Sequence, residues 1–92
     1  SNVKDETTIF LQVSDEGTYY WKKGVSGVPE LIAVSEIAPR LQSYKSSEAN
    51  PRVLIRSDNR AKFGAAIYAL DEVRKADIAQ VSVETLVSQT GR

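Results

Sequence analysis

The sequence contains no cysteine, no histidine and no methionine. Without cysteine, the chain can form neither a disulfide nor a thiolate zinc site. Without histidine, it lacks the side chain that most often serves as a general base, a metal ligand or a pH switch. No serine lies in a Gly-x-Ser-x-Gly context, and no glycine-rich phosphate loop occurs. These absences argue against catalysis, and we expect no enzyme activity, no metal site and no cofactor.

An excess of charge of one sign and long apolar stretches are also missing. Twelve acidic and twelve basic residues cancel, which argues against a nucleic-acid partner because such binding depends on neutralising phosphates. The longest apolar run, residues 63–70, falls short of the roughly 20 residues that a membrane span needs. The length suits one small domain. We expect residues 1–7 to be a tag remnant and the end of a linker, 8–86 to form the domain, and 87–92 to be a frayed C-terminus.

The spacing of apolar residues predicts the order of strands and helices. The predicted elements are a β-hairpin over residues 8–22, a helix over 36–46, a strand over 52–56, a helix over 63–77 and a strand over 79–85. Ser35 is expected to cap the first helix, because a serine followed by an acidic residue is a common helix start. Residues 30–34 leave two alternatives open, since they could extend the sheet or lead into that helix.

The order β-β-α-β-α-β predicts an α+β fold, a two-layer α/β sandwich. Its mixed four-stranded sheet would carry both helices on one face. The expected core is formed by Ile9, Leu11, Val13, Ile37, Leu41, Val53, Ile55, Phe63, Ile67, Leu70, Val81 and Val83. The opposite face of the sheet would carry Phe10, Gln12, Gln80, Ser82 and Glu84. Glu72 is expected on the solvated side of the second helix, beside other charged residues.

One stretch of the chain combines four features in a fixed order. An apolar strand ends in a small residue and an aspartate, an aromatic-glycine pair opens a helix with an internal aspartate, and a basic-alanine turn leads into a last strand. The residues that carry this pattern are Val53, Ile55, Asp58, Phe63, Gly64, Ile67, Leu70, Asp71, Val73, Arg74, Ala76 and Ile78. Together with a hairpin over Asp15, Gly17 and Tyr19, the pattern is similar to the periplasmic domain of the ExbD/TolR family. Asp77 stands where that family usually has glycine, and we expect the turn to survive because aspartate tolerates the left-handed conformation.

The resemblance implies a role in biopolymer transport without covalent chemistry. Full-length members have one transmembrane helix with an essential acidic residue, a linker, and this domain on the periplasmic side of the bacterial inner membrane. They sit within a proton-channel subunit of the ExbB/TolQ type, and proton flow drives motion that reaches a TonB- or TolA-type protein. The implied parent is a single-pass membrane protein whose anchor lies outside this sequence. The domain itself is expected to form homodimers and to contact the cell wall.

Five residues make up the candidate partner-binding set: Asp58, Phe63, Gln80, Ser82 and Glu84. Asp58 has two interpretations. It could present a carboxylate to a partner at the end of a strand, or it could cap the bend that follows through its backbone N–H groups. Residues 80–85 contain neither proline nor lysine, the usual protectors of an edge strand, so another chain could add beside them. The alternative is that this strand is interior or simply short.

Two other function classes remain open at this point. A small ligand-sensing α/β domain would show a defined pocket and would gain stability with a metabolite. An RNA-binding sheet is disfavoured by the zero net charge and by the lack of paired aromatic residues on a central strand. Partner-derived extended peptides would distinguish the interaction module from the ligand sensor.

Overall fold

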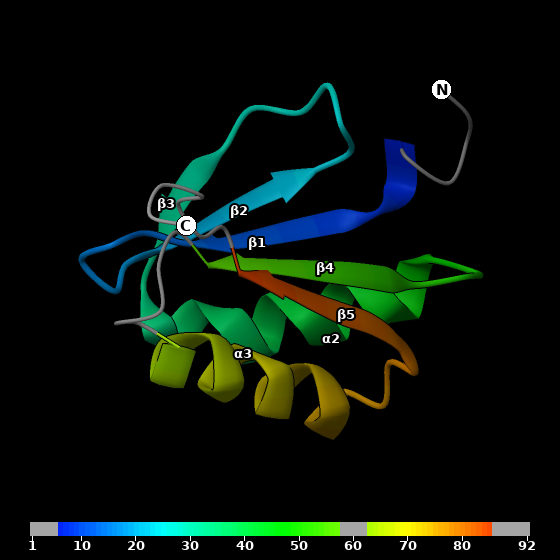
Figure 1. The fold of residues 1–92 in the computed structure, drawn as a ribbon. Helices are drawn as coiled ribbons and strands as arrows, with labels where there is room; N and C mark the ends of the chain where they lie inside the picture. The colour runs from blue at the N-terminus through cyan, green and yellow to red at the C-terminus, as the bar shows by residue number, and fades with distance from the viewer. Residues whose placement is uncertain (1–5, 58–62, 86–92) are drawn as a thin grey trace.

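The computed structural model describes residues 6–57 and 63–85. Its elements are β1 (Ile9–Val13), β2 (Tyr19–Lys23), β3 (Glu30–Ile32), the 3-10 helix η1 (Val34–Glu36), α2 (Ile37–Ser47), β4 (Arg52–Ser57), α3 (Phe63–Lys75) and β5 (Gln80–Thr85). The strands form one mixed sheet in the order β3-β2-β1-β4-β5. β1 is antiparallel to β2 and parallel to β4, and β4 is parallel to β5. Figure 1 shows α2 and α3 below the sheet, so neither of these two helices covers its other face, which is referred to below as the helix-free face.

The predicted α+β class is confirmed, but the sheet has five strands rather than four. The additional strand is β3, which pairs antiparallel with β2 from Glu30 to Ile32. Residues 30–34 therefore do both things that the sequence left open: they extend the sheet and then lead into the helix. β3 forms because Ile32 is buried beside Tyr19 of β2. With only three residues, it shows too little alternation for its sequence to identify it as a strand.

The core lies between the helices and the covered face of the sheet. Its strand residues alternate as predicted, and Ile9, Leu11 and Ile55 are fully buried. Ile37 and Leu41 of α2 close the core from the other layer and are also fully buried. Burying an aliphatic side chain of this size contributes about 1.5–3 kcal/mol relative to leaving it exposed. The predicted alternation of the strands and the register of α2 are therefore both present in the packed core.

The packing face of α3 differs from the predicted one. Phe63 and Ile67 were expected in the core, but 47% of Phe63 and 36% of Ile67 are exposed. The helix instead packs through the small side chains of Ala66 and Ala69, and Val73 continues the same face. Glu72 was expected in solvent, yet it is only 8% exposed because this rotation brings it toward the packed side. The alanines allow α3 to lie closely on a sheet whose inner face is already filled by isoleucine, leucine and valine.

The ends of the helices show one prediction that is wrong and one that is confirmed. Ser35 caps no helix, because η1 already begins at Val34 and Ala33 is its extended N-cap residue. Asp77 does adopt the left-handed conformation, with φ of 67°. Its N–H donates to the carbonyl of Arg74 at 2.9 Å, and the N–H of Ile78 donates to the carbonyl of Val73 at 3.3 Å. This pair of bonds is a Schellman motif, which ends α3 and directs the chain into β5.

Candidate partner-binding site

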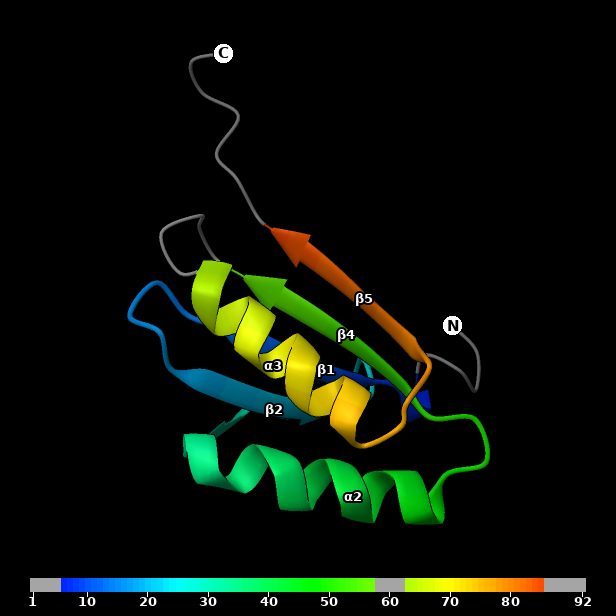
Figure 2. The ribbon, with the colours of Figure 1, turned by 90° about the horizontal axis from the view of Figure 1, so that it is seen from below.

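The structure places the candidate residues on two sides of β5. Gln80, Ser82 and Glu84 are exposed on the helix-free face of the sheet. Phe63 lies at the start of α3, on the opposite side, near the C-terminal ends of β4 and β5 (Figure 2). Asp58 lies outside the described residues, so neither of its interpretations is tested. The three β5 residues therefore share one surface, while Phe63 approaches the same strand from the helix layer.

β5 forms one border of the sheet. It pairs with β4 over six residues, and no other described strand pairs with its outer side. The backbone groups that face outward are an open template for another extended chain. The sequence of β5, Gln-Val-Ser-Val-Glu-Thr, contains neither proline nor lysine. It therefore lacks the two residue types that most often prevent strand addition at a sheet border.

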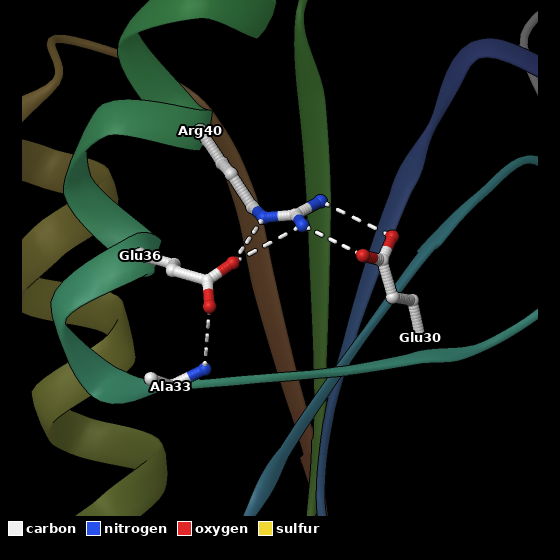
Figure 3. Close-up of polar contacts among 4 residues, drawn as sticks. All are labelled: Glu30, Ala33, Glu36 and Arg40. Carbon is white, nitrogen blue, oxygen red and sulfur yellow. Dashed lines mark hydrogen bonds and ion pairs between the residues drawn. The ribbon is translucent and has the colours of Figure 1, made fainter.

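The opposite border, β3, is shorter and is held by ionic contacts (Figure 3). Arg40 of α2 donates to both carboxylate oxygens of Glu30, at 2.8 and 3.4 Å. The same guanidinium contacts Glu36 at 3.1 Å and lies 5.6 Å from the centre of the Trp21 ring. Glu36 in turn accepts a hydrogen bond from the N–H of Ala33 at 3.3 Å. The hydrogen bond to Glu30 is the largest cause that raises the pKa of Arg40.

This Arg40 network gives the two borders different properties. β3 has three residues, follows Pro29 and carries a charged residue that is already paired. Short length, proline and charge are the features that discourage strand addition. β5 has six residues, no proline and one charged residue near its end, Glu84, which is paired with Arg56 of β4 at 3.4 Å. Of the two borders, β5 is the one suited to docking.

An apolar stripe of α3 flanks the open border. Ala65 and Ile67 lie two residues apart and so point to opposite sides of the helix. The carbonyl of Ala65 accepts a hydrogen bond from the hydroxyl of Tyr19 in β2 at 2.8 Å, which identifies the side of α3 that faces β2. Ile67 and Phe63, at helical spacing on the other side, consequently face β5. Val81 and Val83 of β5 are half-buried on this same side of the sheet.

Tyr68 marks the side of α3 that points away from β5. Burial raises the pKa of Tyr19, and the nearby Tyr68 phenol raises it further. Tyr68 follows Ile67 by about 100° around the helix, which turns it toward the side of Ala65, and it is exposed like Ile67. Ile67 and Tyr68 are therefore suitable for paired substitutions, because both are exposed but only Ile67 is on the β5 side of α3.

The helix-free face of the sheet has a groove of about 340 Å³ where β1, β4 and β5 begin. Phe10 and Leu54 supply its apolar lining, while Arg52, Gln80 and Ser82 supply polar groups. Nearby, Lys22 lies over the Phe10 ring at 5.0 Å. Nothing in this groove pairs a nucleophile with a base, because its side chains are one guanidinium, one amide, two hydroxyls and apolar groups.

A family model described as biopolymer transport protein ExbD/TolR matches residues 1–87. The chain belongs to the ExbD/TolR family. The resemblance found in the sequence is thus confirmed over nearly the whole chain. No curated protein matches the chain at a significant level.

Membership assigns this ExbD/TolR domain to the proteins of biopolymer transport, a family associated with the inner membrane. Neither α2 nor α3, the α-helices bounded within the described residues, has the length and apolar character of a membrane span. Two features of the sheet borders, one near β5 and one at β3, were not predicted from the sequence. Ile67 was assigned to the core, and the contact of Arg40 with Glu30 was not foreseen. The spacing of Glu36 and Arg40 was the one local signal of that network.

Proposed function

We propose that this ExbD/TolR domain is the periplasmic partner-binding and dimerisation module of an inner-membrane complex that converts the proton motive force into work on the cell envelope. The parent would be a single-pass protein held within an ExbB/TolQ-type channel subunit, and its domain would receive a TonB- or TolA-type partner. The module binds through backbone amides and apolar surface and performs no catalysis. Contact with the cell wall is a further part of the proposal. Family membership supports this reading.

The observation that carries the proposal is the open border at β5 with an exposed apolar stripe beside it. A strand added there would lie beneath the β5 side of α3. Side chains on its helix-facing side would cover Phe63 and Ile67, which are 47% and 36% exposed. Side chains on its other side would meet Gln80, Ser82 and Glu84. The preferred segment therefore alternates apolar and polar residues, with the apolar set toward α3.

β5 itself has the required alternation, so a second copy of the domain is a suitable occupant. Val81 and Val83 point to the helix side, and the polar residues of β5 point to the other side. In an antiparallel pair centred on Ser82, Val81 of one copy lies opposite Val83 of the other. The same register sets Gln80 opposite Glu84 and avoids a contact between two carboxylates. Such a pair is isologous, as expected of a twofold dimer.

Self-association is the first test. Sedimentation equilibrium of the wild-type domain should give a dimer that dissociates on dilution. Ile67→Lys places a charge on the stripe, and we expect it to raise the dimer Kd by about tenfold or more, a change of about 1.4 kcal/mol. Tyr68→Lys adds the same charge to the neighbouring exposed position on the other side, and we expect an unchanged Kd. Equal effects of the two lysines would contradict docking at β5.

Partner binding is the second test. NMR titration with extended partner peptides of alternating pattern should shift the amide signals of β5 and of Phe63 and Ile67. The alternative function, a ligand-sensing domain, is favoured by the groove of about 340 Å³, a volume that small-molecule sites share. It would show shifts only with small metabolites, centred on Phe10 and Arg52. That pattern, together with a monomeric protein, would replace the proposed function by the alternative.

A further inference from the structure

Three contacts fasten the N-terminal end of β1 to the rest of the sheet. The hydroxyl of Tyr44 in α2 donates to the carbonyl of Thr7 at 2.5 Å and accepts from the N–H of Arg52 at 3.1 Å. The N–H of Gly24 donates to the carbonyl of Thr8 at 2.8 Å. Tyr44 thereby joins Thr7, two residues before β1, to Arg52, the first residue of β4. The fastening lies where the preceding chain meets the sheet.

From this point, the shortest route to the open border crosses two strand pairs. β1 is paired with β4 over five residues, and β4 is paired with β5 over six. All three strands run in the same direction, so their first residues lie at the fastened end. A force on the N-terminus and an opposing force on the far end of β5 would act along the strands. With strands about 4.8 Å apart and a rise of about 3.3 Å per residue, the pull is directed more along the strands than across them.

A force along the strands is resisted differently from a force across them. The hydrogen bonds between strands run across the strand direction, so a pull along the strands loads the bonds of a ladder together. A pull that separates two paired ends opens the bonds one after another. Ile9 and Lys23 are directly opposite each other in β1 and β2. A force between the N-terminus and Lys23 therefore opens the hairpin from one end.

We propose that this domain is a load-bearing element, in which β1, β4 and β5 form a shear-resistant path from the N-terminus to the docking border. The proposal rests on the proposed function for the direction of the load, because that function tethers the domain at its N-terminus and docks partners at β5. The resistance itself is a property of the strand order and of the fastening by Tyr44. It is present in the isolated domain, with or without a partner.

Single-molecule pulling on the whole chain tests this inference. The sequence has no cysteine, so one introduced thiol gives one defined attachment. One handle is placed at the N-terminus and the other on Glu84→Cys, which loads the three parallel strands along their length. The matched control carries the second handle on Lys23→Cys, which opens the β1–β2 hairpin. Both positions are exposed strand residues near a strand end, and urea denaturation of both variants verifies that their equilibrium stabilities are equal.

The expected result is a several-fold higher mean unfolding force for the Glu84 attachment than for the Lys23 attachment. Forced unfolding reports the unfolding barrier along the pulling direction and not the equilibrium stability. Equal forces, or a lower force at Glu84, would overturn the proposal. Adding Tyr44→Phe to the Glu84 variant should lower its force, and an unchanged force would remove Tyr44 from the load path. Either failure would leave the dimer and peptide experiments unaffected, so the two proposals can fail separately.

Discussion

Removing the hydroxyl of Tyr44 is the sharpest test of how the two layers are joined. Tyr44 is 6% exposed, and its hydroxyl bonds to the carbonyl of Thr7 and to the N–H of Arg52. Tyr44→Phe keeps the ring, so no large cavity forms. Two lost hydrogen bonds at about 0.5–1.5 kcal/mol each predict a loss of about 1–3 kcal/mol in the free energy of unfolding. For a domain of this size, each kcal/mol lowers the Tm by roughly 4–8 °C.

Urea denaturation followed by circular dichroism measures this loss as a lower midpoint with an unchanged slope. Tyr68→Phe is the matched control, because Tyr68 is 42% exposed whereas Tyr44 is buried. We expect Tyr68→Phe to stay within about 0.5 kcal/mol of the wild type. If Tyr44→Phe were equally mild, the hydroxyl would contribute nothing to the joint between α2, β1 and β4. The account of the N-terminal fastening would then be wrong.

The remaining predictions concern pH, backbone conformation and the β3 border. Burial raises the pKa of Tyr44 above its ordinary value, so the native state favours the neutral phenol. Its contribution to the free energy of unfolding is complete below about pH 10 and is lost as the pH rises further. This dependence on pH should be weaker in Tyr44→Phe. Because Asp77 has positive φ, Asp77→Gly should stabilise by about 0.5 kcal/mol and Asp77→Ala should destabilise by about 1 kcal/mol in urea titrations. Gly24→Ala should cost about 2 kcal/mol or more in the same assay, since φ is +82° and a Cβ would lie 2.6 Å from the carbonyl oxygen of Glu6. Arg40→Ala should lower the free energy of unfolding by about 1 kcal/mol, because it removes exposed ion pairs and the contact with Trp21. Hydrogen exchange of this variant should show faster opening of β3 than of β5. Uniform exchange at both borders would contradict the role of Arg40.

The fold was predictable where a local pattern had one interpretation. The alternation of Ile9, Leu11 and Val13 determines which face of β1 is buried, and the structure has that face inward. The left-handed turn at Asp77 was also predictable, because a helix must end before the last strand can begin. In both places, the physical cause acts within a few residues of the chain.

Prediction failed where the outcome depends on distant partners. α3 carries two overlapping stripes, one through Phe63 and Ile67 and one through Ala66 and Ala69. Only the packed sheet determines that the small residues face inward. The hydroxyl contacts of Tyr44 and the pairing of Glu30 with Arg40 likewise join residues that the chain separates. Of the candidate site, Gln80, Ser82 and Glu84 could be placed on one face of a strand from the sequence. Whether that strand is a border of the sheet stayed open, and the rotation of α3 that exposes Ile67 was not predicted.

The unequal borders of the sheet limit how far assembly can proceed. In the proposed dimer, the open β5 border of each copy is covered by the β5 strand of the other. The two outer borders of the dimer would then both be β3, which the ion pair between Glu30 and Arg40 joins to α2. A longer assembly would need a second open sheet border on each copy, and β3 is not suited to strand addition. The proposed assembly would therefore stop at two copies and would not extend into a fibril.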